Sequence, residues 1–382
     1  YYNDQFPGRN GLVKISNKIK AFYSFLKIGD GATILQNKGG VGDGEALSHE
    51  AESNTATSEQ TTAAPSQTEA NTETTQPENA FKVNEGDKET VYTNNYIVLL
   101  DNRLMEQYTN VYKKMDVYAE TLNKLKSQMP DVKVYSLMAP TSIEFYAPKK
   151  YNSGKSHSQY QGINYIYGEL KGITPVDAYP EIAAHTNEYL YFRSDHHWTA
   201  RGAYYAYRAF AKTAGFTPVD INTLETGKLS PFLGTLYRAT QSSAVEKHPD
   251  YVEYFIPKTH TEAIASDTDP TLGSNYKVKV INTEIKSSNK YLAFLGGDHG
   301  VTKITTDAPG DRSIVVIKES YANAFVPWLC NNYKTIYVVD PRQMDVNLAS
   351  FVKTNAIDEV LFLNYMFIPT NPKYMAALEK MG

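Results

Sequence analysis

The strongest chemical signal in the sequence is the run Asp195-His196-His197-Trp198. A carboxylate that holds one imidazole nitrogen makes the other nitrogen a usable base, and it stabilises the imidazolium formed in the transition state. In an extended segment, residues two apart point the same way, so Asp195 and His197 can face one cleft while His196 faces elsewhere. The pattern favours His197 as a general base oriented by Asp195. A polar helix entry with solvent-facing imidazoles explains the same motif equally well.

Ser320 is the hydroxyl that such a base could serve. It lies between an apolar run at 313–317 and a predicted helix, where a serine has an exposed hydroxyl. Backbone N–H groups at a helix start can also stabilise an oxyanion. The surrounding residues do not form the Gly-x-Ser-x-Gly turn of α/β-hydrolases. The alternative is an ordinary N-cap serine.

Two further motifs were weighed for ligand binding. The run Gly296-Gly297-Asp298-His299-Gly300 can bring backbone N–H groups close to a substrate, or it can be a plain turn. It lacks the spacing and the lysine of a phosphate-binding loop. The letters Asp-His-His at 195–197 resemble the motif of the manganese-dependent DHH phosphoesterases, but the additional aspartates of those enzymes are missing. We therefore expect no metal and no cofactor.

The elements that must position these residues alternate between helices and strands. Apolar residues at steps of three or four predict a helix over 103–129 and a strand over 132–138. A second helix is predicted for 199–214, with Thr199 as N-cap and Gly215 as its stop. Further strands are predicted at 291–295, 313–317, 335–339 and 359–363. This alternation predicts an α/β fold with a mostly parallel central sheet.

In a parallel sheet, ligands bind beyond the carboxyl ends of the strands. Polar side chains follow the predicted strands at Asp298, His299, Ser320, Asp340 and Asn364. We therefore expect these groups to gather at one edge of the sheet.

Composition narrows the function classes. The net charge of -4 argues against a nucleic-acid binder, which usually carries a basic excess. The 30 tyrosines suit a carbohydrate groove, although half-buried core positions explain them as well. Cys330 is the only cysteine, so no intrachain disulfide forms, and its apolar neighbours at 325–329 predict a packed residue and not a nucleophile. No run of about 18 apolar residues is present.

The region 53–79 has no aliphatic residue larger than alanine and no aromatic residue. Such a segment buries too little surface to offset its chain entropy. We predict three parts: an N-terminal segment at 1–38 that packs on the catalytic domain, a disordered insertion at 39–86, and the catalytic domain at 87–382. The first residue is Tyr1 and not methionine, so we expect an upstream signal or membrane anchor.

Taken together, the motifs resemble the DHHW proteins, relatives of the alginate O-acetyltransferases AlgJ and AlgX in the SGNH hydrolase superfamily. The resemblance rests on 4–9, 195–198 with 202–205, 296–300, 320–323 with Pro327, and 340–342. Relatives often keep an aspartate before the serine, where this chain has Glu319. The resemblance implies a three-layer SGNH-hydrolase-like (flavodoxin-like) fold.

The resemblance also implies roles for single residues. Ser320 matches the nucleophile, and Asp195 and His197 match the acid–base pair. We expect the Ser320 N–H to form the oxyanion hole, with Gly297 and Asn364 as weaker contributors. Aromatic residues expected along a sugar path are Tyr321, Trp198 and Tyr204.

The implied function is an extracytoplasmic O-acetyltransferase that moves acetyl groups through an acetyl-serine onto an exopolysaccharide or cell-wall polysaccharide. Its expected partners are that polysaccharide acceptor and a membrane acetyl exporter. A carbohydrate acetylesterase on the same residues differs only in using water at the second step. A non-catalytic polysaccharide-binding protein with a relic site is the third alternative.

Overall fold

The computed structural model describes residues 89–92 and 97–382. The predicted N-terminal segment (1–38) and disordered insertion (39–86) lie outside the described residues. Among the described residues, no helix combines the length and the apolar character needed to cross a membrane.

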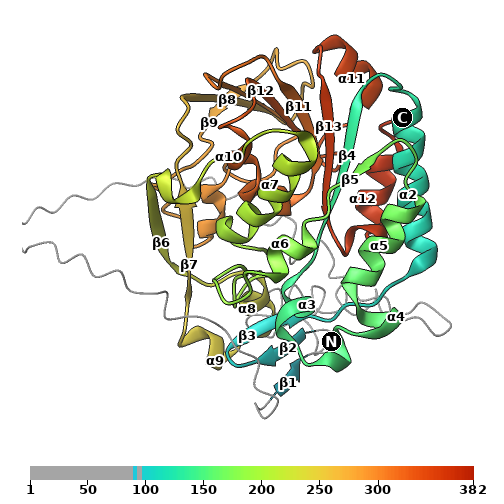
Figure 1. The fold of residues 1–382 in the computed structure, drawn as a ribbon. Coiled ribbons are helices and arrows are strands. Elements are labelled where there is room, and N and C mark those ends of the chain that lie inside the picture. The colour runs from blue at the N-terminus through green and yellow to red at the C-terminus, as the bar shows by residue number, and fades with distance from the viewer. Residues whose placement is uncertain (1–88, 93–96) are drawn as a thin grey trace, which may run out of the picture.

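The central sheet of the described chain has the strand order β5-β4-β13-β11-β12-β10-β8-β9 (Figure 1). Neighbouring strands from β5 to β12 are parallel, and those from β12 to β9 are antiparallel. Its strands are β4 (Lys133–Ala139), β5 (Thr174–Pro175), β8 (Thr261–Ser266), β9 (Tyr276–Val278), β10 (Val301–Thr306), β11 (Ser313–Lys318), β12 (Thr335–Val339) and β13 (Glu359–Tyr365). The α/β class with a mostly parallel central sheet is confirmed.

Two smaller sheets lie beside the central one. The first contains β1 (Glu89–Tyr92), β2 (Ile97–Leu100) and β3 (Arg103–Glu106), and the second pairs β6 (Thr226–Phe232) with β7 (Asp250–Phe255). The β1–β2–β3 sheet lies at the bottom of the view and the β6–β7 pair at its left side, with the short helices α8 (Thr235–Thr240) and α9 (Ser243–Glu246) between them (Figure 1).

Helices form the two outer layers. One group comprises α2 (Tyr112–Ser127), α5 (Gln159–Glu169), α11 (Leu348–Thr354) and α12 (Pro372–Glu379), and the other comprises α6 (Tyr179–Ala183), α7 (Ala200–Ala214) and α10 (Val326–Leu329) (Figure 1). The short helices α3 (Ser142–Tyr146) and α4 (Gly154–His157) follow β4. Single 3₁₀ turns cover Lys149–Tyr151, Ile221–Thr223, Lys290–Ala293, Ser320–Ala324 and Ile368–Thr370.

Several predicted elements are confirmed. Strand β12 has the predicted bounds, and β4, β11 and β13 differ from theirs by one or two residues. The Thr199 hydroxyl accepts a hydrogen bond from the Gly202 N–H and caps α7, and Gly215 ends it at φ 77°. Cys330 is buried, which raises the pKa of its thiol to about 12, as suits a packed apolar residue.

The predicted helix over 103–129 is confirmed in its larger part as α2 (Tyr112–Ser127), whereas its first part and one predicted strand were wrong. Residues 103–106 of the expected long helix form β3, because Asp101 and Asn102 adopt positive φ values and close a two-residue hairpin with β2. The expected strand 291–295 contains the 3₁₀ turn Lys290–Ala293 instead. Its apolar side chains are buried by loop packing, and burial alone does not distinguish such a turn from a strand.

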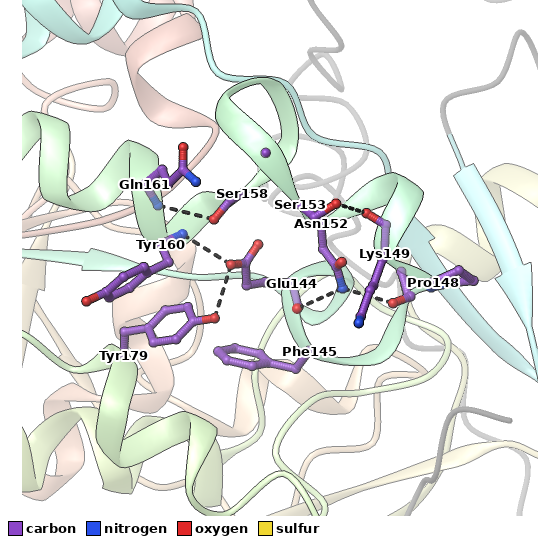
Figure 2. A pocket seen from close by; sticks show the side chains of 12 residues that line it. Glu144, Phe145, Pro148, Lys149, Asn152, Ser153, Ser158, Tyr160, Gln161 and Tyr179 are labelled. Carbon is purple, nitrogen blue, oxygen red and sulfur yellow. Dashed lines mark hydrogen bonds between the residues drawn. The ribbon is translucent and has the colours of Figure 1, made fainter. Parts of the chain in front are cut away.

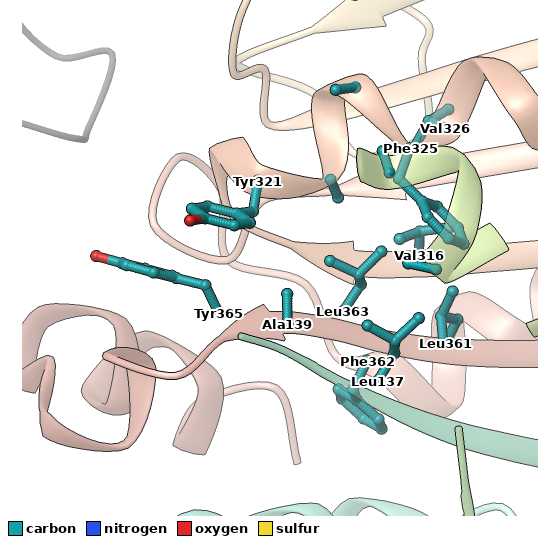
Figure 3. Packing of buried hydrophobic residues seen from close by; sticks show 14 of the residues in the cluster. Leu137, Ala139, Val316, Tyr321, Phe325, Val326, Leu361, Phe362, Leu363 and Tyr365 are labelled. Atoms are coloured by element: carbon teal, nitrogen blue, oxygen red, sulfur yellow. The ribbon is translucent and has the colours of Figure 1, made fainter. Parts of the chain in front are cut away.

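The apolar core extends to the carboxyl ends of β11 and β13, next to Ser320. Val316, Leu361 and Leu363 extend from β11 and β13 into the apolar layer, and Tyr321 and Tyr365 lie at the edge of this layer (Figure 3). These two tyrosine rings stack at 4.8 Å between centroids. A tightly packed base therefore fixes the loops that leave β11 and β13.

Candidate functional site

Three predicted residues meet in one hydrogen-bonded chain. The Asp195 Oδ1 lies 2.6 Å from His197 Nδ1, and His197 Nε2 lies 2.8 Å from Ser320 Oγ. All three side chains are nearly buried, with Ser320 6% exposed and His197 4%. Asp195 Oδ1 also accepts the backbone N–H of His197. This geometry matches a hydroxyl activated by an oriented imidazole.

A neighbouring loop fixes Asp195 from its other side. The Thr235 N–H donates to Asp195 Oδ2 at 2.7 Å, and the Thr235 hydroxyl donates to the same oxygen at 3.0 Å. A Cβ atom on Gly234 would lie 2.3 Å from the Asp195 side chain, so only glycine permits this approach. The start of α8 thus sets the orientation of the carboxylate.

The carboxyl group of Asp195 is kept ionised by its surroundings. Burial alone raises the pKa of Asp195, but the imidazoles of His197 and His196 and the donated hydrogen bonds hold it well below its usual range. Burial lowers the pKa of His196 to about 3, aided by the adjacent His197. His196 is therefore neutral, and its Nδ1 lies 2.8 Å from the Thr235 hydroxyl. It supports the loop that holds Asp195.

Tyr291 covers one face of the imidazole. Its ring stacks on His197 at 4.0 Å between centroids and 16° between planes. Its hydroxyl donates to the backbone carbonyl of Ser320 at 2.9 Å. A single side chain therefore fixes both the base and the residue that carries the nucleophile.

The turn that presents Ser320 is held by the residue before it. Glu319 accepts the N–H of Tyr321 at 2.9 Å and the N–H of Tyr365 at 3.0 Å, so its carboxyl group ties the 3₁₀ turn to the end of β13. Burial raises the pKa of Glu319 to about 8, against these two hydrogen bonds. The Trp198 indole N–H donates to the Tyr321 carbonyl at 2.8 Å.

A buried ion network lies below the same turn. Asp298 accepts Lys318 Nζ at 2.6 Å and Arg342 Nη2 at 2.9 Å, and Arg342 also binds Asp340 at 2.6 Å. Asn323 donates to Asp298 at 2.8 Å. Burial raises the pKa of Asp298, but Lys318 and Arg342 outweigh it and hold the pKa well below its usual range. The network joins the ends of β11 and β12 to the 296–300 turn.

Asp195, His196 and His197 offer ligand atoms within 4.8 Å of one another, which would suit a metal ion. The donors are already committed to protein groups, however. Both oxygens of Asp195 accept hydrogen bonds, and both nitrogens of His197 face Asp195 and Ser320. A metal ion would have to break this chain, so the donor set fits a serine-based site better.

Four side chains that were predicted to contact substrate are buried and hydrogen-bonded to other protein groups. The side chains of Trp198, Tyr204 and Tyr321 are buried, and their polar atoms bind the backbone of Tyr321, Val219 and His196 respectively. Asn364 is buried too, and its amide binds the hydroxyls of Tyr118 and Tyr374.

These four side chains therefore support the fold around the site, and their expected roles along a sugar path or in an oxyanion hole stay predictions. The sequence alone could not show that their polar atoms already bind other protein groups.

Gly297 is half-buried with φ 123°, in a backbone conformation that favours glycine. Its N–H already donates to the Phe294 carbonyl at 3.3 Å, so the expected oxyanion role has no support from this geometry. The role of the Ser320 N–H stays a prediction.

Sequence reasoning missed Thr235, Gly234 and Tyr291. No local pattern marks them, because each acts across a gap of at least 29 residues on Asp195, His197 or Ser320. The glycine of the Gly234-Thr235 pair is the one local feature that would have allowed a loop to approach a carboxylate closely.

Comparison with known proteins gives three structural similarities. A DHHW family protein from Eubacterium siraeum has 30% identity and a TM-score of 0.68, over 75% of this chain and 96% of that one. Bacillus cereus PatB1, solved with a sulfonyl adduct, has 18% identity and a TM-score of 0.59, over 73% and 98%. The O-acetyltransferase domain of Pseudomonas putida AlgJ has 13% identity and a TM-score of 0.41, over 76% and 99%.

No curated protein matches the chain. The similarity to PatB1 extends to the fold. The family model described as "DHHW protein" matches residues 1–339, which include the Asp195–Trp198 motif and Ser320. The chain belongs to the DHHW family.

Proposed function

We propose that this protein is an SGNH-type O-acetyltransferase that acylates a polysaccharide through an acetyl-serine. The observation that carries the proposal is the continuous chain from Asp195 through His197 to the Ser320 hydroxyl. A buried hydroxyl placed at 2.8 Å from an oriented imidazole nitrogen is the arrangement that nucleophilic acyl transfer needs. The fold shared with PatB1, which was solved with a sulfonyl adduct, agrees with the proposal.

In the first step, His197 Nε2 takes the Ser320 proton while Oγ attacks the acetyl carbonyl carbon. The tetrahedral intermediate collapses, the acetyl–oxygen bond of the donor breaks, and His197 gives its proton to the leaving alcohol. In the second step, His197 takes a proton from a sugar hydroxyl, whose oxygen attacks the acetyl-serine. Collapse restores the Ser320 hydroxyl with that proton and releases the acetylated sugar. Asp195 stabilises the imidazolium in both steps.

The setting of the reaction forms part of the same proposal. The acceptor is an exopolysaccharide or a cell-wall polysaccharide outside the cytoplasm. A membrane partner exports the acetyl group to this site. Water in place of the sugar hydroxyl would make the same site an acetylesterase.

The decisive test is hydrolysis of para-nitrophenyl acetate by the wild type and by Ser320→Ala. We expect Ser320→Ala to lower kcat by at least about a thousandfold, because the variant lacks the hydroxyl that receives the acetyl group in the first step. Ser313→Ala is a matched control, since Ser313 is also buried and begins the strand that precedes Ser320. Mass spectrometry should find the acetyl group on Ser320 of the wild type.

A chelator should leave the rate unchanged, and adding an oligosaccharide acceptor should divert acetyl groups from water to sugar. Equal rates for the wild type and Ser320→Ala would remove the serine mechanism. Free acetate as the only product, whichever acceptor is present, would make the protein an esterase.

A further inference from the structure

An open pocket of ≈ 830 Å³ is lined by residues between Glu144 and Tyr179 and does not include Ser320 (Figure 2). Three rings border it: Phe145 from α3, Tyr160 from α5 and Tyr179 from α6. Tyr160 is 44% exposed, which is unusual for a large ring among the described residues. The pocket is large enough for a small ligand and joins apolar faces to polar groups.

One buried carboxylate holds the three helices together. Glu144 on α3 accepts the N–H groups of Gln159 at 2.8 Å and Tyr160 at 3.1 Å, where α5 begins. It also accepts the Tyr179 hydroxyl at 3.1 Å (Figure 2). Burial raises the pKa of Glu144 against these hydrogen bonds. Burying a carboxylate costs free energy. The Glu144 carboxylate fixes the helix positions from which the three aromatic rings project.

The rings are arranged as neighbouring, inclined surfaces. Tyr160 and Tyr179 lie 4.7 Å apart at 49°, and Phe145 and Tyr179 lie 5.2 Å apart at 42°. Exposed polar side chains stand at the rim of the pocket on Lys149 and Gln161. A pyranose ring has an apolar face that stacks on an aromatic ring and hydroxyls at its edge that bind such polar groups. Rings fixed in advance also lower the entropy cost of binding.

The pocket is connected to the catalytic segment through the end of β4. Gln159 binds both the N–H and the hydroxyl of Thr141, which follows β4 and precedes α3. The adjacent Pro140 carbonyl accepts the Tyr191 hydroxyl at 2.8 Å, and the Tyr191 backbone pairs with Trp198, next to His197.

The strand order also places the pocket and the nucleophile at one edge of the sheet. Strand β4 lies beside β13, whose last residue, Tyr365, binds Glu319 immediately before the nucleophile. Pocket and nucleophile therefore lie at the same carboxyl edge of the sheet.

We propose that the Phe145–Tyr160–Tyr179 pocket is a carbohydrate subsite that holds pyranose units of the acceptor polysaccharide while a neighbouring unit reaches Ser320. Its part in transfer rests on the proposed function. Sugar binding itself does not, because it needs no turnover.

The test measures oligosaccharide binding to the full-length Ser320→Ala protein by titration calorimetry. Cellotetraose, chitotetraose and a galacturonic acid oligomer serve as probes for neutral, acetamido and acidic pyranose chains. We expect at least one to bind, and Tyr160→Ala to weaken its binding about tenfold through loss of a stacking face. Tyr276→Ala is the matched control, because Tyr276 is 42% exposed and lies on β9, outside the pocket. It should bind the sugar as the parent does.

Every outcome of the binding experiment supports or overturns the carbohydrate subsite. Binding that Tyr160→Ala weakens and Tyr276→Ala preserves supports the subsite, provided that thermal unfolding shows both variants folded. Failure of all three sugars to bind overturns it, as does binding that Tyr160→Ala leaves unchanged. A fatty acid that binds through Tyr160 when the sugars do not would also overturn it. The ester assay with Ser320→Ala reports on the proposed function separately, so the two ideas can fail independently.

Discussion

The His197 imidazole rests against the face of the Tyr291 ring at 4.0 Å. The face of an aromatic ring carries negative potential and attracts a cation more strongly than a neutral group. In the proposed mechanism His197 takes the serine proton and carries a positive charge in the transition state, so this contact strengthens as that state forms. The stack would then contribute differential stabilisation, and it also limits the orientation of the imidazole.

We predict that Tyr291→Leu lowers kcat for ester hydrolysis about tenfold, while Tyr291→Phe stays within about threefold of the wild type. Loss of the ring removes about 1 kcal/mol of cation–π stabilisation, and phenylalanine retains it. The measurement is steady-state kinetics with para-nitrophenyl acetate, where kcat should fall more than KM rises. Phe294→Leu is the control, since that ring packs edge-on against Tyr291 and not on His197. Equal losses in the Phe and Leu variants would contradict the proposed role of the stack.

At the scale of elements, the site depends on a buried ion network that fastens strand ends to loops. Two cations, Lys318 and Arg342, face two anions, Asp298 and Asp340, and these side chains are at most 3% exposed. Removing one member of such a network leaves a buried charge without its counterpart. The turn that carries Ser320 follows Lys318 directly and is therefore sensitive to that loss.

We predict that Asp298→Asn lowers the free energy of unfolding by about 3–5 kcal/mol, because Lys318 and Arg342 then share a single carboxylate. Urea unfolding at neutral pH measures the change. The exposed Asp311 offers a matched control, and Asp311→Asn should cost less than about 0.5 kcal/mol. A similar small change in both variants would show that the network contributes little.

Elements with one buried face or clear capping residues were predictable from the sequence. Helix α7 has its N-cap at Thr199 and its left-handed stop at Gly215, and both are local signals. Residues 103–106 could not be predicted, because Met105 fits the apolar spacing of the following helix, and β3 is buried at all four positions and so shows no alternation. Their strand pairing with β2 decided the outcome, and such pairing is not a property of the local sequence.

Some residues of the candidate site were predictable from the sequence, and others were not. Asp195 and His197 are two residues apart, so their shared direction follows from backbone geometry. Ser320 follows a buried strand, which placed it at the correct edge. Thr235 and Tyr291 come from other parts of the chain, and only the folded structure brings them to Asp195 and His197.

At the scale of the whole molecule, buried carboxylates link stability to pH. The pKa values of Asp195 and Asp298 both lie well below 3.8, the ordinary value of an aspartate. As the pH falls, the unfolded chain therefore binds protons at these positions before the folded protein does. The stability that these two carboxylates contribute is complete above that ordinary value, and it is lost as the pH falls through their folded-state pKa values.

We predict that the wild-type thermal midpoint falls steeply as the pH is lowered from about 4 to about 2, where these linked protons are taken up. Asp298→Asn should show a shallower decline over the same range, since one of the linked groups is gone. Differential scanning fluorimetry across this pH series is the measurement, with Asp311→Asn expected to follow the wild type. Parallel curves for wild type and Asp298→Asn would exclude Asp298 as a source of the acid sensitivity.

Strand β13 lies between β4 and β11, although it follows both of them along the chain. During synthesis on a ribosome, β4 emerges first and then lacks its inner neighbour until residues 359–365 have been made. Until then both β4 and β11 expose an unpaired edge, which is open to pairing with other chains. The central sheet, and with it the support that Tyr365 gives to Glu319 beside Ser320, is completed only after translation has passed Tyr365.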